Sequence, residues 1–212
     1  MTTFSSFCFL TRKILKYLPK YVMAMLFVLE FINISTADNR KIVTKNLLDP
    51  DSDLYFYLIH PKHLSYFYRI RPAKDFGKPL NFTMNGIYLV PVEPIQGCGE
   101  ITNSLIVKDN IAFVVRGECS FVSKSLQAEA AGARAIIIFD KEEKNDDMYI
   151  DMIHDGTKRE SNLPAFFLLG KNGWMIQKSL EAMKMSHAII DMPINVTGIP
   201  TNDFMQPPWT LW

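Results

Sequence analysis

Residues 109–121 read Asp109-Asn110-Ile111-Ala112-Phe113-Val114-Val115-Arg116-Gly117-Glu118-Cys119-Ser120-Phe121, and residues 130–139 read Ala130-Ala131-Gly132-Ala133-Arg134-Ala135-Ile136-Ile137-Ile138-Phe139. Each segment contains a continuous apolar run, Ile111–Val115 and Ala135–Phe139, which is typical of a strand buried on both faces. Between the two runs, Ser120 predicts the N-cap of a helix of about 11 residues. Strand, helix and strand in this order predict a right-handed βαβ unit.

The same order of elements recurs downstream, where Asn172 is the expected cap of a second helix. The elements expected there are a strand at 165–169, a helix with Ile176, Leu180 and Met183 on one face, and strands at 188–190 and 194–197. For the first helix, the spacing i, i+4, i+8 predicts an apolar stripe of Val122, Leu126 and Ala130. Two β-α-β passages within 212 residues predict one α/β domain.

The first half of the chain has shorter strand signals, several of them aromatic. Strands are expected at 54–59, 64–70 and 87–90, with a further short strand at 148–153. Asn85-Gly86 predicts a turn. Residues 38–52 are polar and contain Asp49-Pro50-Asp51, so they are expected to form a flexible leader.

The composition is that of a globular protein, with 48% apolar and 21% charged residues. The net charge of +1 comes from 23 basic and 22 acidic residues. A protein that binds nucleic acid over a whole domain normally has a clear basic excess. A nucleic-acid partner is therefore not expected.

Residues 1–37 have the pattern of a secretory signal peptide. A basic flank that includes Arg12 and Lys20 precedes the apolar run Tyr21–Leu29, and small residues allow cleavage after Ala37. The run is shorter than the ~20 apolar residues that span a bilayer, so no stable membrane anchor is expected after cleavage. The alternative is an N-terminal amphipathic or membrane-anchoring segment. Without residues 1–37, which hold four basic residues and one acidic residue, the net charge is −2.

The cysteine count agrees with an extracellular protein. Cys8 leaves with the signal peptide, and Cys98 and Cys119 remain. An even number of cysteines in an oxidising compartment favours one disulfide. A loop of this length makes such a bond worth roughly 3 kcal/mol. The alternative is two buried free thiols.

Three N-glycosylation sequons occur, at Asn33, Asn81 and Asn195. The first lies in the expected signal peptide. Asn81 and Asn195 are expected glycan sites of the mature chain, provided that both side chains lie at the surface.

Catalytic motifs with a defined spacing are missing from the sequence. It contains no Gly-x-Ser-x-Gly, no His-Glu-x-x-His and no phosphate-binding Gly-x-x-x-x-Gly-Lys-Ser/Thr motif. His60 and His63 are read as turn residues, although they could in principle share a metal. The acids around His154, Asp151 and Asp155 could ligate calcium, but they lack the fixed spacing of a calcium loop. No catalytic residue, metal ligand or cofactor is therefore predicted.

The sequence around the first predicted helix resembles the protease-associated (PA) domain. The resemblance lies in the first apolar strand, the Arg116-Gly117 pair, Cys119-Ser120-Phe121 and the small-residue segment before the second strand. The resemblance covers about residues 53–197 and includes the Pro164 that precedes the next apolar strand. Three further segments are similar to secreted proteins of this family that consist of a signal peptide and one PA domain. These segments are Pro72–Gly77, Cys98–Glu100 and residues 206–212. The resemblance implies a β-rich sheet or partly open barrel with flanking helices.

The resemblance also implies a non-catalytic role, because PA domains act as accessory modules that bind proteins or peptides. We therefore expect a signal peptide (1–37), a leader (38–52), a PA domain (53–197) and a C-terminal tail (198–212). The expected function is a secreted, N-glycosylated interaction module. The alternatives are a secretory-pathway sorting or retention factor and a small hydrolase with an unrecognised site.

The partner is expected to be a protein or peptide, and the oligomeric state is not predicted. A ligand surface is expected on loops, but no binding residue is named. The loops considered are 72–79, 91–99, 141–147 and 156–163. Trp209 and Trp212 are expected to fold back onto the domain, since exposed tryptophans are costly; the alternative is a binding peptide.

Overall fold

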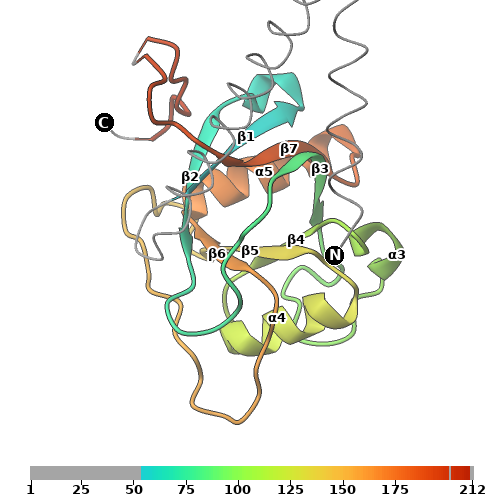
Figure 1. The fold of residues 1–212 in the computed structure, drawn as a ribbon. Coiled ribbons are helices and arrows are strands. Elements are labelled where there is room, and N and C mark those ends of the chain that lie inside the picture. Colours follow the sequence, from blue (N-terminus) through green and yellow to red (C-terminus); the bar gives the residue numbers. More distant parts are fainter. Residues whose placement is uncertain (1–53, 201, 211–212) are drawn as a thin grey trace, which may run out of the picture. The chain divides into compact units, whose positions relative to one another are not determined.

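The computed structural model describes residues 54–200 and 202–210 (Figure 1). The expected signal peptide and leader, with Cys8 and Asn33, lie outside the described residues, and so does Trp212. The elements are β1 (Leu54–His60), the 3-10 helix η2 (Lys62–Leu64), β2 (Phe67–Pro72), β3 (Met84–Pro91), α3 (Ser104–Val107), β4 (Ile111–Val115), α4 (Phe121–Ala130), β5 (Ala135–Phe139), β6 (Ala165–Leu168), α5 (Gly170–Met183) and β7 (Ala188–Ile194).

The seven strands form a closed barrel in the order β1-β2-β6-β5-β4-β3-β7. Strands β3, β4, β5 and β6 are parallel neighbours, and the other pairs are antiparallel. The expectation of a partly open barrel is therefore wrong. Closure comes from β7, which pairs with β3 on one side and with β1 on the other.

The expectation of two strands, at 188–190 and 194–197, is wrong. The structure has one strand in which Ala188, Ile190 and Met192 are buried at alternate positions. Pro193 lies next to the last residue of the strand, where the missing N–H removes little pairing. The strand pairs Leu89 of β3 with Ala188 and Tyr55 of β1 with Ile194.

The first βαβ unit is confirmed. Strands β4 and β5 are parallel and in register from Ile111 opposite Ala135 to Val115 opposite Phe139, with α4 between them. The second passage is not a βαβ unit, because β6 pairs with β5 and β2 whereas β7 runs antiparallel to β3. A parallel crossover that was not expected joins β3 to β4 through residues 92–110 and the short helix α3.

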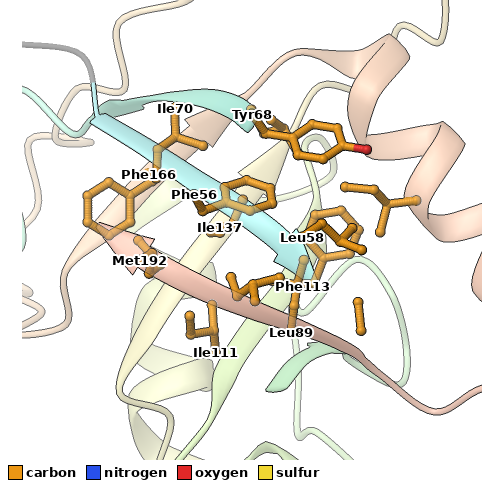
Figure 2. Close-up of a cluster of buried hydrophobic side chains, with 14 of the residues drawn as sticks. Phe56, Leu58, Tyr68, Ile70, Leu89, Ile111, Phe113, Ile137, Phe166 and Met192 are labelled. Carbon is orange, nitrogen blue, oxygen red and sulfur yellow. The ribbon is translucent and has the colours of Figure 1, made fainter. Parts of the chain in front are cut away.

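The two continuous apolar runs occupy β4 and β5, and every residue in both strands is buried. Alternate side chains, such as Ile111 and Phe113, join the large cluster in Figure 2, which also takes residues from β1, β2, β3, β6 and β7. The residues between them, such as Val114 and Ile138, join a second cluster that contains Ala128 of α4. Burial on both faces therefore explains the absence of polar alternation.

Helix α4 begins as predicted, since Ser120 Oγ accepts a hydrogen bond from Ser123 N at 3.1 Å. Of its expected stripe, Val122 is buried as predicted, but Ala130 is exposed and Leu126 is half-buried. The buried residues are Val122, Lys124, Ser125 and Ala128. A lysine and a serine replace aliphatic residues on the buried face, so hydropathy alone misplaced that face.

Helix α5 begins at Gly170, two residues before the predicted cap. Asn172 lies inside the helix and is buried. Ile176 and Leu180 are buried as predicted and pack in the main cluster, but Met183 is 47% exposed. The helix starts early because glycine allows a very close approach: a Cβ on Gly170 would lie 2.0 Å from the Glu142 carbonyl oxygen.

Three further expectations are corrected by local structure. Strand β2 begins at Phe67, because residues 62–64 form η2. Asn85-Gly86 lies inside β3 as an irregularity in the pairing with β7, and Gly86 has φ +64°. Residues 148–153 form no strand: Met152 is buried, but Met148 is 68% exposed. One buried anchor within an exposed loop does not establish a strand pattern.

The described part of the tail folds back, as expected for Trp209. Its ring packs edge-on against Tyr66 with centroids 5.6 Å apart, and its Nε1 donates a hydrogen bond to Asn172 Oδ1 at 2.9 Å. Asn172 thus holds the tail instead of capping the helix.

Gly173 gives a first test of the packing between α5 and the barrel. An added Cβ would lie 2.3 Å from Phe139 Cβ, and Phe139 is fully buried. We expect Gly173→Ala to lower the free energy of unfolding by about 1–3 kcal/mol, although alanine favours an exposed helix by about 1 kcal/mol. Gly99→Ala, which meets nothing within 4 Å, is the control in urea denaturation. An equally stable Gly173→Ala protein would contradict this packing.

Trp209 gives a test of tail docking. Trp209→Ala removes the ring contact and leaves Asn172 Oδ1 without its donor, so we expect a loss of about 2 kcal/mol in unfolding free energy. Met205→Ala changes a residue that is 51% exposed in the same tail and is expected to have little effect. Equal stability of the two variants would show that the tail is not docked in solution.

Candidate functional site

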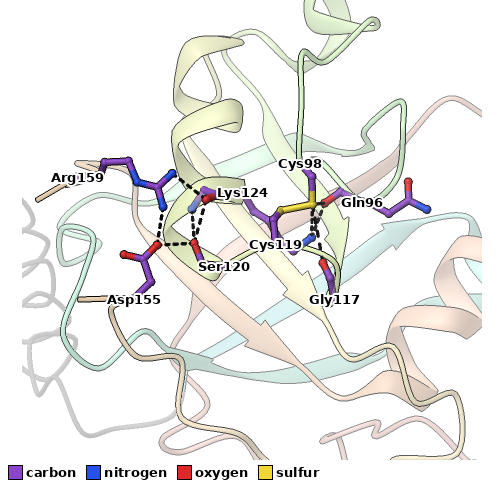
Figure 3. Close-up of a disulfide and its surroundings, with 9 residues drawn as sticks. Gln96, Cys98, Gly117, Cys119, Ser120, Lys124, Asp155 and Arg159 are labelled. Carbon is purple, nitrogen blue, oxygen red and sulfur yellow. Dashed lines mark hydrogen bonds and ion pairs between the residues drawn. A yellow bond between two sulfur atoms is a disulfide. The ribbon is translucent and has the colours of Figure 1, made fainter. Parts of the chain in front are cut away.

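A disulfide lies beside the carboxyl end of β4. It joins Cys98, in the loop after β3, to Cys119, with a Cα–Cα distance of 5.8 Å (Figure 3). Together, this bond, the loop that carries Cys98 and the turn that carries Cys119 form the disulfide corner. Between β4 and Cys119, Gly117 has φ +115° and Glu118 has φ +65°. The turn at Arg116-Gly117 therefore needs the backbone freedom of glycine, and it directs Cys119 toward the start of α4.

Lys124 lies beside this disulfide and is fully buried. Its Nζ donates a hydrogen bond to the Gln96 carbonyl oxygen at 2.5 Å and lies 3.5 Å from Cys98 Sγ (Figure 3). Burial lowers the pKa of Lys124 to about 8, although the charge of Glu118 acts in the opposite direction. Lys124 therefore links α4 to the loop that carries Cys98.

Asp155 attaches a second loop to the start of α4. It accepts a hydrogen bond from Ser120 Oγ at 2.5 Å and pairs with Arg159 at 2.7 Å. The hydrogen bonds from Ser120 and then Thr157, together with the charge of Arg159, hold the pKa of Asp155 well below its usual range. Arg159 also donates to Ser123 Oγ at 3.0 Å.

Two further acids in the segment between β5 and β6 pair with basic side chains. Lys171 lies 2.8 Å from Asp146 and lowers the pKa of that carboxyl, chiefly through their hydrogen bond. Asp151 pairs with Lys74 at 3.4 Å. Within residues 54–200 and 202–210, no group of three or more His, Cys, Asp or Glu residues is placed to hold a metal ion.

The four histidines do not form a common site. His63 Nε2 lies 2.5 Å from Ser179 Oγ, and His154 Nε2 lies 2.8 Å from the Arg159 carbonyl oxygen. His187 stacks on Tyr88 with centroids 3.9 Å apart, and burial lowers its pKa, followed by the charge of His60.

A surface groove lies between three segments that are distant in sequence. Its residues are Lys78, Pro79, Asn81, Phe82, Glu129, Ala133, Arg134, Asn162, Leu163 and Pro164. The Arg134 guanidinium lies over the Phe82 ring, 5.0 Å from its centroid. Two of the loops considered from the sequence, 72–79 and 156–163, contribute to the groove.

One carboxylate lines this groove and already has hydrogen-bond donors. Glu129 Oε2 accepts from Ser161 Oγ at 3.0 Å and from Asn162 N at 3.2 Å. Lys78 and Arg134 form no ion pair within the part of the chain that the structure describes. The ionisable residues of the groove, two basic and one acidic, give it a net positive charge.

The two predicted glycan acceptors in the described chain are exposed. Asn81 lies in the lining of the groove, and Asn195 follows β7. Lys124, Phe82 and Arg134 were not singled out from the sequence. A signal for Lys124 did exist: it is four residues before Ala128 and therefore on the same face of α4.

No helix among the described residues is long and apolar enough to cross a membrane. Residues 87–176 match the PA domain family. The PRADC1-like protein of Drosophila melanogaster is 41% identical over 183 residues, which are 85% of this chain and 92% of that protein.

More distant similarities cover parts of larger proteins. The ER degradation-enhancing alpha-mannosidase-like protein 3 of Xenopus laevis is 30% identical over 56% of this chain but 14% of its own length. Among solved structures, the aminopeptidase from Aneurinibacillus sp. strain AM-1 has a TM-score of 0.44 and 21% identity, over 66% of this chain and 30% of that one. The match to the PA domain and the similarity over almost the whole Drosophila protein show that the chain belongs to the PA-domain family, as a relative of the PRADC1-like proteins.

Proposed function

We propose that this protein is a secreted, N-glycosylated and non-catalytic module that binds an acidic peptide segment of a partner protein in the groove that Phe82 and Arg134 line. The observation that carries the proposal is the guanidinium of Arg134, held over the Phe82 ring in a groove with excess positive charge. Arginine on an aromatic face still offers its N–H groups to a carboxylate in the plane of the guanidinium.

The apolar lining of the groove supports a peptide rather than a simple anion. Pro79, Leu163 and Pro164 stand beside the two cations. A peptide with an acidic residue next to an apolar one can contact both kinds of surface at once. The proposed ligand is therefore an extended acidic-apolar segment.

The chemistry of the groove favours binding over bond cleavage. Its polar side chains are an ammonium, a guanidinium, two amides and Glu129. Catalysis by a general base needs a carboxylate free to reach the substrate proton. Glu129 instead holds the loop at Ser161 and Asn162 through two hydrogen bonds.

Three observations support the secretory route. The sequence begins with a signal-like segment, Cys98 and Cys119 are joined, and a more distant relative carries a name that refers to ER degradation. Disulfides of this kind persist in oxidising compartments. Exposed Asn81 and Asn195 are accessible to glycosylation.

Mass spectrometry of protein recovered from the medium of expressing cells tests this route. We expect a mature N-terminus after Ala37, an oxidised Cys98–Cys119 pair, and glycans on Asn81 and Asn195 that are lost in Asn81→Gln and Asn195→Gln. A chain that stays in the cell with an intact N-terminus and reduced cysteines would contradict the proposed route.

Selection from a random peptide library tests the groove. On the wild-type protein, freed of N-glycans by enzymatic digestion because Asn81 lines the groove, we expect enrichment of acidic-apolar peptides, and at least a tenfold weaker affinity for Arg134→Glu, which replaces attraction by repulsion. Lys158→Glu reverses the charge of an exposed residue outside the groove and is the matched control. Calorimetry with the enriched peptide measures the affinities. Equal binding by Arg134→Glu would exclude the groove, and no enrichment on the wild type would contradict a peptide-binding module.

A further inference from the structure

We propose that Cys98–Cys119 is an exchangeable disulfide that a dithiol reductant opens, and that the Lys124 ammonium then holds Cys98 as a thiolate. The inference goes beyond the proposed binding function and does not depend on it. It rests on the position of Lys124, which is fully buried and whose Nζ lies 3.5 Å from Cys98 Sγ (Figure 3).

In the oxidised protein, the environment of Lys124 is poor for a charge. The side chain is fully buried, and Nζ contacts the Gln96 carbonyl oxygen and the sulfur of Cys98. An ammonium has three N–H donors, and a disulfide sulfur is a weak acceptor. Burial accordingly lowers the pKa of Lys124 to about 8.

Reduction supplies the missing negative charge. A thiolate at Cys98 would lie 3.5 Å from Nζ, where two opposite charges attract strongly in a protein interior. The carbonyl oxygens of Gln96 and Gly117 are also near Cys98 Sγ, at 3.7 and 3.8 Å. Their partial negative charges oppose the thiolate, but they are farther away and smaller than the full charge of the ammonium. The charge of Glu118, which acts on Lys124, opposes the thiolate as well. The reduced form of this cysteine pair is therefore more stable than that of a pair with no cation beside it.

The bond can be reached from solvent. Cys98 and Cys119 are each half-buried, and Gly99 next to Cys98 is exposed. A Cβ built on Gly99 meets nothing within 4 Å, so the chain next to Cys98 is open to solvent. Lys124 itself is fully buried.

The exchange balances in two steps. A thiolate of the reductant attacks Cys119 Sγ, the disulfide breaks, and Cys98 leaves as a thiolate beside Lys124. The second thiol of the reductant, once deprotonated, attacks the mixed disulfide and releases Cys119, which takes up a proton. Two electrons pass from the dithiol, which becomes a disulfide. The dithiol also loses two protons. Cys119 takes up one of them, and the other goes to solvent, or to Lys124 where that amine is neutral. A leaving thiol with a lowered pKa speeds the first step.

Opening the bond is expected to leave the barrel folded. The loop with Cys98 keeps backbone hydrogen bonds from Val115 N to the Ile95 carbonyl and from Thr102 N to the Glu93 carbonyl. The buried members of the interior cluster come from other segments, and Ile95 of this loop packs against them. Reduction should therefore release Gln96, Cys98 and the start of α4 locally.

The test is a redox titration of the intact protein with dithiothreitol, with alkylation and mass spectrometry to count free thiols. We expect Lys124→Met to shift the midpoint at least tenfold in the thiol-to-disulfide ratio, which is about 30 mV toward more negative potential. Lys124→Arg keeps the positive charge, so its midpoint should lie close to that of the wild type. Lys144→Met, at an exposed position in the segment between β5 and β6, should match the wild type. Equal midpoints for Lys124→Met and wild type would overturn the proposal.

A second measurement applies even if Lys124→Met lowers overall stability. In Cys119→Ser, the rate of Cys98 alkylation against pH reports the thiol pKa directly. We expect that pKa to lie below the ordinary value of about 8.5 with Lys124 present and to rise in the double variant with Lys124→Met. An ordinary thiol pKa in Cys119→Ser would overturn the proposed ion pair. Loss of near-UV circular dichroism in step with wild-type reduction would overturn local opening.

Discussion

Strand β7 pairs with β1 and with β3, and this double pairing closes the barrel. Every strand then has a neighbour on both sides, so no backbone edge among the seven strands is left to pair with another chain. Closure also encloses the interior cluster, in which Phe56, Tyr68 and Phe113 are fully buried. The Tyr68 hydroxyl donates to the Leu64 carbonyl oxygen at 3.0 Å, and burial raises the pKa of that phenol. The surfaces that carry function are built on this barrel.

Two such surfaces flank α4. At its start, the disulfide, Lys124 and Asp155 fasten two loops to the helix through one covalent bond and several charged contacts. Near its end, Glu129 fixes residues 161–162 and helps to shape the groove that contains Arg134. The first surface contains a covalent bond that reduction would open, whereas the second is made of ordinary side-chain contacts. The proposed peptide binding and the proposed thiol exchange would thus use opposite ends of the same helix.

The bounds of strands β4 and β5 were predicted to the residue. Because both faces of these strands are buried, each strand appears in the sequence as a continuous apolar run, without alternating polar residues that make its ends hard to locate. Ser120 was equally clear, since a cap is a local interaction. The sequence did not predict the unity of β7, because pairing with two distant strands overrides the local effect of Pro193. Nor did it predict the roles of Lys124 and Asn172: a polar residue is buried when a specific partner satisfies it, and those partners, Gln96 and Trp209, are 28 and 37 residues away. The groove was missed because its residues come from three separate segments.

If barrel and corner are independent structural units, they should open separately. Hydrogen exchange followed by mass spectrometry on the oxidised and the reduced wild-type protein measures this directly. We expect equal protection of β1 and β7 in both states, with faster exchange on reduction confined to residues 96–99 and 117–124. Loss of protection in β7 and β1 together with the corner would contradict this expectation, because the disulfide would then be holding the barrel itself.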